Sequence, residues 1–98
     1  MTEEHGGLLG KWGKMRLDFM EQKNPAICQM MRKSGTLNDY LENYQSTFEI
    51  RAERILEEIR KKRGITEELW ELNPFEWIMR DADAMVEVQS ILRKEIER

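Results

Sequence analysis

The chain has 98 residues, a net charge of −3 and one cysteine, with 36% charged and 40% hydrophobic side chains. This length suits one small domain, and the apolar content is too high for a wholly disordered chain. The lone Cys28 excludes an intramolecular disulfide and favours a reducing compartment. No apolar run is long enough to span a membrane and the start lacks a secretory signal pattern, so we expect a cytoplasmic protein without a membrane partner.

Apolar residues at helical spacing predict a first helix close to the N-terminus. The stripe consists of Leu8, Trp12, Met15 and Phe19, widened by Leu9 and Met20. We expect Trp12 to be a core anchor, with Gly10 and Gly13 allowing another backbone to approach it closely and making the helix start irregular. Residues 1–7 are predicted to be a flexible N-terminus that precedes one helical domain over residues 8–98.

A short second helix is predicted to start at Asn24-Pro25 and to end at Ser34-Gly35. Asparagine caps helices, proline fits the first turn, and glycine adopts the left-handed conformation that closes a helix. We expect Ile27, Met30 and Met31 to line the inner side of this helix.

A long third helix is predicted over residues 37–63, between the capping residue Thr36 and the terminating Gly64. Its inward stripe is Leu37, Tyr40, Leu41, Tyr44, Phe48, Ala52, Ile55, Leu56 and Ile59. Four basic residues at positions 60–63 complement the negative end of the helix dipole.

Two further helices complete the chain. Thr66 is predicted to cap a short fourth helix, and Asn73-Pro74 then starts a last helix over residues 75–97. The predicted inner face of this last helix is Phe75, Ile78, Met79, Ala82, Met85, Val86, Leu92 and Ile96. No segment alternates with the period of a strand. The chain is therefore predicted to be all-α, a small bundle of about five helices in which 37–63 and 75–97 form a long antiparallel pair.

Charge is segregated along the chain. Residues 11–33 carry a net charge of +4 and residues 60–63 another +4, whereas residues 34–59 sum to −4 and residues 64–98 to −5. Basic clusters of this kind are compatible with contacts to DNA phosphates. The candidate nucleic-acid contacts are Lys11, Lys14, Arg16, Arg32, Lys33, Arg60, Lys61, Lys62 and Arg63.

Residues 25–44 also have the outline of a helix-turn-helix. A recognition helix here would offer Asn38 and Gln45 to base edges, but Asp39 and Glu42 would repel phosphates. The alternative interpretation is that the basic runs are ordinary solvent-exposed surface and bind no DNA.

Protein binding is the other class of function that the pattern favours. Trp70, Phe75, Trp77 and Met85 form a candidate protein interface, because exposed aromatic patches mark such interfaces. The near-heptad spacing over residues 78–96 supports an alternative in which the chain is a homodimeric or partner-binding module without a nucleic-acid role.

Several kinds of catalysis lack the residues that they need. The only histidine is His5, the cysteine has no CxxC companion, and neither Gly10-Lys11 nor Gly13-Lys14 has the glycine and hydroxyl spacing of a phosphate-binding loop. A membrane-surface helix at residues 8–20 is disfavoured by the acidic remainder of the chain. We therefore expect no enzyme activity, no cofactor, no metal and no small-molecule substrate.

The order of these signals resembles the transposon-encoded TnpV family over residues 8–97. The matching blocks are Gly10-Lys11-Trp12-Gly13-Lys14-Met15-Arg16, Ser34-Gly35-Thr36-Leu37-Asn38-Asp39-Tyr40-Leu41, Gly64-Ile65-Thr66-Glu67-Glu68-Leu69 and Glu76-Trp77. Within them we take Gly10, Trp12, Gly13, Gly35 and Leu37 as the signature residues. The resemblance implies an accessory protein of a mobile element, encoded beside a large serine recombinase, with an excisionase-like role by analogy. It implies DNA or the recombinase as partner and supplies no catalytic residues.

Overall fold

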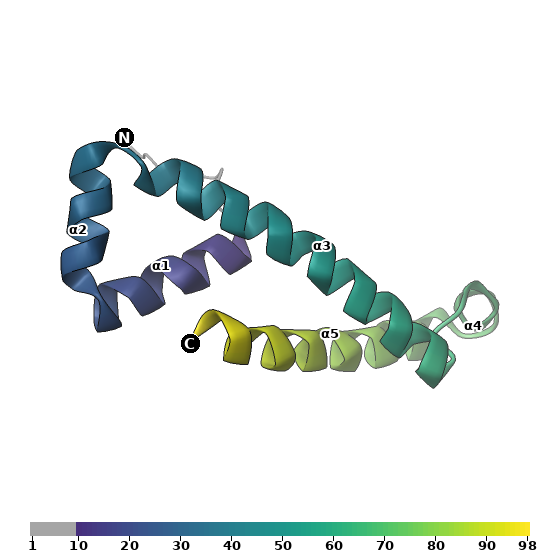
Figure 1. The fold of residues 1–98 in the computed structure, drawn as a ribbon. Helices are drawn as coiled ribbons and strands as arrows, with labels where there is room; N and C mark the ends of the chain where they lie inside the picture. Colours follow the sequence, from purple (N-terminus) through teal and green to yellow (C-terminus); the bar gives the residue numbers. More distant parts are fainter. Residues whose placement is uncertain (1–9) are drawn as a thin grey trace. The chain divides into compact units, whose positions relative to one another are not determined.

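The computed structural model describes residues 10–98 and contains, over that range, five α-helices and no strand (Figure 1). The helices are α1 (Lys11–Lys23), α2 (Pro25–Ser34), α3 (Leu37–Arg63), α4 (Glu67–Leu72) and α5 (Pro74–Ile96). The all-α class is confirmed. The observed bounds of α3 are the predicted ones, and α5 begins and ends one residue before its prediction. The predicted N-terminal segment 1–7, His5, Leu8 and Leu9 lie outside the described residues.

Glycine ends two of the helices for the expected reason. Gly35 and Gly64 have φ values of +78° and +67°, in the left-handed region that side chains disfavour. After Gly35, the Thr36 N–H donates to the Met31 carbonyl at 3.0 Å, and after Gly64 the Ile65 N–H donates to the Arg60 carbonyl at 2.9 Å. These bonds satisfy carbonyls that a helix end would leave unpaired.

The predicted side-chain caps at Thr66 and Asn73 are confirmed, and the one at Asn24 is wrong. The Thr66 hydroxyl accepts the Leu69 N–H at 3.2 Å, which caps α4 as expected. Asn73 accepts the Glu76 N–H at 3.1 Å and so caps α5, but Asn24 makes no side-chain cap to α2. The backbone carbonyl of Asn24 instead accepts from Cys28, and Pro25 supplies the rigid first turn.

The described chain forms two compact units. Unit 1 contains the described residues up to Glu49 together with Glu95–Arg98, and unit 2 contains Ile50–Lys94. Helices α3 and α5 contribute to both units. The organisation of residues 8–98 as one domain stays a prediction.

Unit 1 is held together by apolar side chains from its first three helices. Met20, Cys28, Leu37 and Leu41 form a buried cluster with Leu17, Met31 and Tyr40 packed against it. Trp12 is 4% exposed, so its predicted place in the core is confirmed. The neighbour of its glycines is a side chain and not the expected backbone: the Gly13 N–H donates to Gln45 Oε1 at 2.9 Å, and a Cβ on Gly10 would lie 2.5 Å from Gln45 Nε2.

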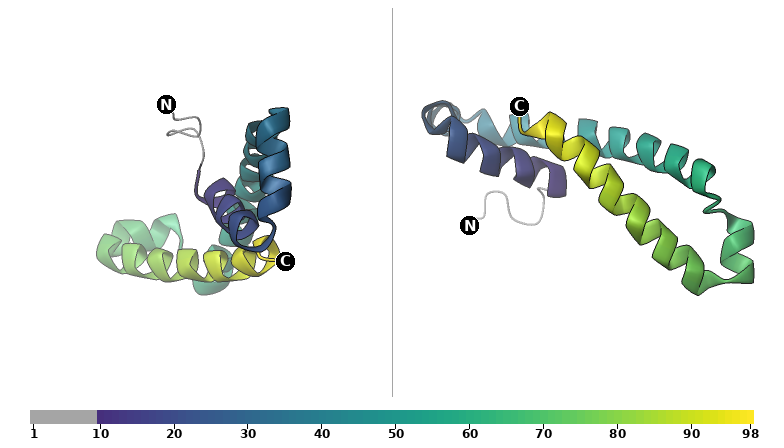
Figure 2. Two further views of the ribbon diagram at one scale, coloured as in Figure 1. Left: turned by 90° about the vertical axis from the view of Figure 1, so that its left-hand side faces the viewer. Right: turned by 90° about the horizontal axis from the view of Figure 1, so that it is seen from below.

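Within unit 2, the C-terminal half of α3 and α5 run in opposite directions and are joined by α4 (Figure 2). Ion pairs of Arg60 with Asp81 and of Arg63 with Glu87 link the two helices. The inward stripe predicted for α3 is confirmed throughout, because all its members are buried or half-buried.

The predicted inner face of α5 is wrong over its first three turns. Ile78, Ala82 and Val86 are exposed, and Ala84 and Val88 are buried in their place. The prediction is confirmed at the C-terminal end of the helix, where Leu92 and Ile96 are buried. Helix α5 carries apolar residues on more than one side, so two stripes satisfy the helical period equally well. The small Ala84 permits close packing, and the ion pair of Asp81 places that side of the helix toward α3.

Helix α2 shows the same kind of difference. Cys28 is 1% exposed and Met31 is half-buried, but Ile27 and Met30 are 52% and 68% exposed. The short helix therefore buries Cys28 and Met31, three positions apart, on a side that is rotated about the helix axis from the predicted one.

Candidate functional site

Arg16, a predicted phosphate contact, has a structural role in unit 1. Its Nε donates to the Tyr40 hydroxyl at 3.0 Å and its Nη1 donates to the Ile96 carbonyl at 2.7 Å. The guanidinium also lies 5.4 Å and 5.3 Å from the ring centres of Phe19 and Tyr44. The side chain therefore satisfies the end of α5 and fills the space between aromatic rings.

Burial raises the pKa of Tyr44 above its ordinary value, although the nearby Arg16 acts in the opposite direction. The ring of Tyr44 stacks on Phe48 with centroids 4.5 Å apart. A hydroxyl with a raised pKa stays protonated at neutral pH, so Tyr44 contributes packing and not a base.

The other arginines of the basic set are also engaged. Arg32 lies 2.8 Å from Glu21, and Arg63 pairs with Glu87. Arg60 donates Nε to Asp81 Oδ1 at 2.8 Å and Nη2 to Oδ2 at 3.1 Å, and its guanidinium lies 5.3 Å from the ring centre of Trp77. The hydrogen bond to Asp81 raises the pKa of Arg60. All four arginines are therefore committed to partners inside the protein.

The lysines of the same set are in a different state. All five are exposed, and within residues 10–98 none of them has an ion-pair partner. They are Lys11, Lys14, Lys33, Lys61 and Lys62. Lys11 lies over the Trp12 ring at 5.7 Å, where exposure keeps the interaction weak. Of the nine predicted phosphate contacts, these five have charges that no other residue of the segment 10–98 neutralises.

One side of α5 is an exposed apolar surface of unit 2. We define the α5 apolar face as Phe75, Ile78, Met79, Ala82 and Val86. Phe75, Ile78, Met79 and Val86 are 72%, 51%, 55% and 66% exposed. Because the five residues are separated by three, one, three and four positions, they lie in one row along about three turns of helix.

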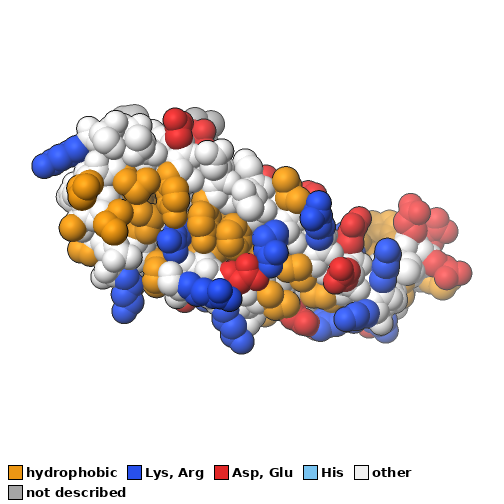
Figure 3. All heavy atoms as spheres, in the orientation of Figure 1, with side chains coloured by type: hydrophobic (Ala, Val, Ile, Leu, Met, Phe, Trp, Pro, Cys, Tyr) orange, Lys and Arg blue, Asp and Glu red, His pale blue; other side chains and the backbone are white. Residues whose placement is uncertain are grey.

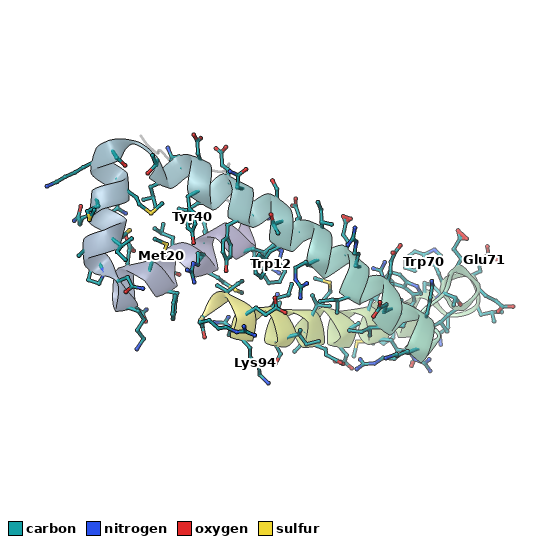
Figure 4. All side chains as sticks on the ribbon, viewed as in Figure 1. Trp12, Met20, Tyr40, Trp70, Glu71 and Lys94 are labelled. Atoms are coloured by element: carbon teal, nitrogen blue, oxygen red, sulfur yellow. The ribbon has the colours of Figure 1, made fainter. Side chains whose placement is uncertain are left out.

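The four residues predicted as a protein interface do not form one surface. Phe75 belongs to the α5 apolar face, while Met85 is half-buried. Trp70 and the half-buried Trp77 pack edge to face with centroids 5.3 Å apart, and Trp70 lies between α4 and the end of α3 (Figure 4). Whether these residues bind a partner stays a prediction.

Carboxylates surround this region of unit 2. Residues 67–87 hold seven carboxylates and one basic residue, Arg80. Acidic side chains gather over α4 in the space-filling view (Figure 3). Among the described residues, those without an ion-pair partner here are Glu67, Glu68, Glu71 and Asp83.

Across residues 10–98 there is no group of three or more histidine, cysteine, aspartate or glutamate side chains that could hold a metal ion. No helix over the same residues is both long enough and apolar enough to cross a membrane.

Sequence reasoning missed the exposed side chains of Ile78, Met79 and Val86, which it placed in the core. Their spacing was visible in the sequence, but the same spacing is also produced by buried residues. Asp81 lies on the same side of α5 as Ala84 and Val88, and its ion pair with Arg60 marks the side that faces α3. The sequence does not show that pairing, so it offered no signal that separates the two stripes.

The helices and their surface define a small all-α protein with an exposed apolar face on its last helix. The family model of the transposon-encoded protein TnpV matches residues 1–96. The chain therefore belongs to the TnpV family of transposon-encoded proteins. No curated protein and no solved structure matches the chain.

The signature residues of this resemblance have structural positions. Gly10 caps α1 beside Gln45, and Gly13 donates its N–H to the same side chain. Trp12 and Leu37 are buried, and Gly35 ends α2 in the left-handed conformation. These residues explain how unit 1 packs and do not form a site for chemistry.

Proposed function

We propose that this chain is a non-enzymatic accessory protein of its transposon that acts by binding another protein through the α5 apolar face. The observation that supports the proposal is the row of four large apolar side chains that are each more than half exposed. Contiguous apolar surface of this kind is uncommon on monomeric proteins and marks interaction sites. Full burial of an exposed side chain of this kind contributes about 1.5–3 kcal/mol. Because 51–72% of each of the four is still exposed, burying them against a partner contributes the corresponding share, which offsets part of the cost of association.

The partner that the family resemblance suggests is the serine recombinase of the same element. We expect Ile78→Asp to weaken binding to the purified recombinase by at least about tenfold, because it places a charge in the centre of the apolar row. Biolayer interferometry with the immobilised recombinase measures this change.

Ile50→Asp is the matched control, because Ile50 is 55% exposed and lies on α3, outside the apolar face. Circular dichroism verifies that both variants keep their helices. Equal binding by the two variants would show that the α5 apolar face is not the contact surface.

DNA contact is the second candidate, supported by the five lysines without ion pairs. Each phosphate contact contributes about 0.9 to the slope of log affinity against log salt concentration. We expect weak binding to the DNA ends of the element, and Lys14→Ala to reduce the slope by about one. Gel shifts over a series of salt concentrations measure the slope.

Arg63→Ala is the informative comparison, since Arg63 is already paired with Glu87 at an exposed site and should leave the slope unchanged. Absence of a gel shift at low salt, or a shift that does not depend on salt, would exclude phosphate contacts by these lysines.

A further inference from the structure

A pocket of about 400 Å³ opens in unit 2 where the end of α3, α4 and the start of α5 meet. Its lining residues are Arg60, Ile65, Thr66, Glu67, Trp70 and Trp77. This volume lies at the lower end of the range of about 300–1,000 Å³ that is typical of ligand sites. Trp77 leaves α5 on the side that faces Arg60 of α3, whereas the α5 apolar face is open to solvent. The pocket is therefore a separate site.

The walls of the pocket are suited to an apolar side chain. Ile65 is 4% exposed and forms a fixed apolar wall, while Trp70 is 46% exposed and has indole surface open to solvent. The edge-to-face contact with Trp77 holds the Trp70 ring in place. A phenyl or branched aliphatic group that packs against Trp70 therefore buries apolar surface against a ring that is already held in place. Binding does not have to include the entropic cost of ordering that ring.

The charges around the pocket favour a cation beside that apolar group. Asp81 neutralises Arg60 through two hydrogen bonds, so the arginine contributes little net positive charge. Within the described chain, Glu67 has no ion-pair partner, and Glu68 and Glu71 add two more free carboxylates on the same short helix. Phosphate groups would be repelled by these carboxylates, which argues against a nucleobase as the group that stacks on Trp70.

We propose that this pocket binds an apolar side chain of a partner protein, at a position directly followed by lysine or arginine. The apolar side chain packs between Ile65 and Trp70, and the adjacent cation pairs with Glu67. This is a second contact point, and it neither requires nor involves the α5 apolar face.

The test uses the full chain and three capped dipeptides, acetyl-Phe-Lys-amide, acetyl-Phe-Gln-amide and acetyl-Phe-Glu-amide. Tryptophan fluorescence reports binding, because the peptides contain no indole and Trp12 is buried elsewhere, in unit 1. We expect affinity to fall in the order Lys, Gln, Glu, with about threefold to fivefold between the first and the last. Equal affinity for the three peptides, or no fluorescence change, would overturn the proposal.

Glu67→Gln should abolish the preference for the lysine peptide. Glu68→Gln is the matched control, since it removes the same charge from the same first turn of α4 but does not line the pocket. Trp70→Ala should remove binding of all three peptides, which is followed here by NMR chemical-shift changes because the variant lacks the reporting indole, and circular dichroism verifies its helices. Equal effects of Glu67→Gln and Glu68→Gln would show that the preference is a general property of an acidic surface, and would overturn the assignment to Glu67.

Two further probes distinguish other occupants. If free phenethylamine binds as tightly as the lysine dipeptide, the site selects a small aromatic amine and not a partner protein. If a single-stranded oligonucleotide binds and the binding is lost in Trp70→Ala, the site stacks bases. Either result would contradict the proposal and would leave the Ile78→Asp experiment on the recombinase unaffected.

Discussion

Arg16→Ala is expected to lower the free energy of unfolding by about 3 kcal/mol, since hydrogen bonds to a charged group contribute roughly 1.5–3 kcal/mol and ring contacts add to them. The substitution leaves the Tyr40 hydroxyl and the Ile96 carbonyl without the donor that now satisfies them. It also opens the space beside Phe19 and Tyr44 that the guanidinium fills. Urea denaturation followed by circular dichroism measures the loss.

Arg54→Ala is the matched control, because Arg54 is exposed and has no hydrogen-bond or ion-pair partner over residues 10–98. We expect it to change stability by less than about 0.5 kcal/mol. Arg16→Lys keeps the charge but not the planar fork, so it should recover only part of the loss. A loss in Arg16→Ala no larger than that in Arg54→Ala would show that the contacts of Arg16 contribute nothing net.

How far the sequence predicts this fold depends on how many sides of each helix are apolar. Helix α3 has one apolar stripe and, apart from Ile50, a largely polar remainder, and its buried residues were all predicted. Helix α5 has apolar residues on two sides, and the spacing alone does not decide between Val86 and Val88. The contact that decides is the ion pair between Arg60 and Asp81, which joins residues 21 positions apart. A pairing at that sequence separation leaves no periodic trace in the chain.

The candidate site shows the same limit. Sequence clustering identified nine basic residues, but it did not separate arginines from lysines, and the structure divides the set along that line. A guanidinium has a planar array of donors that suits carboxylates, carbonyls and aromatic rings at once, as at Arg16 and Arg60. An ammonium on a flexible chain stays hydrated, as at Lys61. Whether a basic residue is an arginine or a lysine was therefore more informative about its role than its place in a cluster along the sequence.

Binding through the α5 apolar face and binding through the pocket place different demands on a partner. The face offers a row of side chains with no enclosing wall, so its contribution depends on area and on exclusion of water. The pocket has an apolar wall at Ile65 and Trp70, and under the proposal Glu67 adds a charge preference. A partner that uses both would lose affinity with Ile78→Asp and charge selectivity with Glu67→Gln, and the two losses should be additive because the substitutions share no contacts.

Leu41→Ala is expected to have the largest effect on stability of any substitution considered above, a loss of about 2–5 kcal/mol. Leu41 is fully buried in the cluster with Met20, Cys28 and Leu37, and removal of its side chain leaves a cavity among neighbours from three helices. A domain of this size has a total stability of roughly 5–15 kcal/mol, so the loss is a large fraction of it. Urea denaturation again measures the loss.

Leu72→Ala makes the same chemical change at a side chain that is 79% exposed and should cost less than about 0.5 kcal/mol. Similar losses in the two variants would contradict the assignment of Leu41 to the core of unit 1.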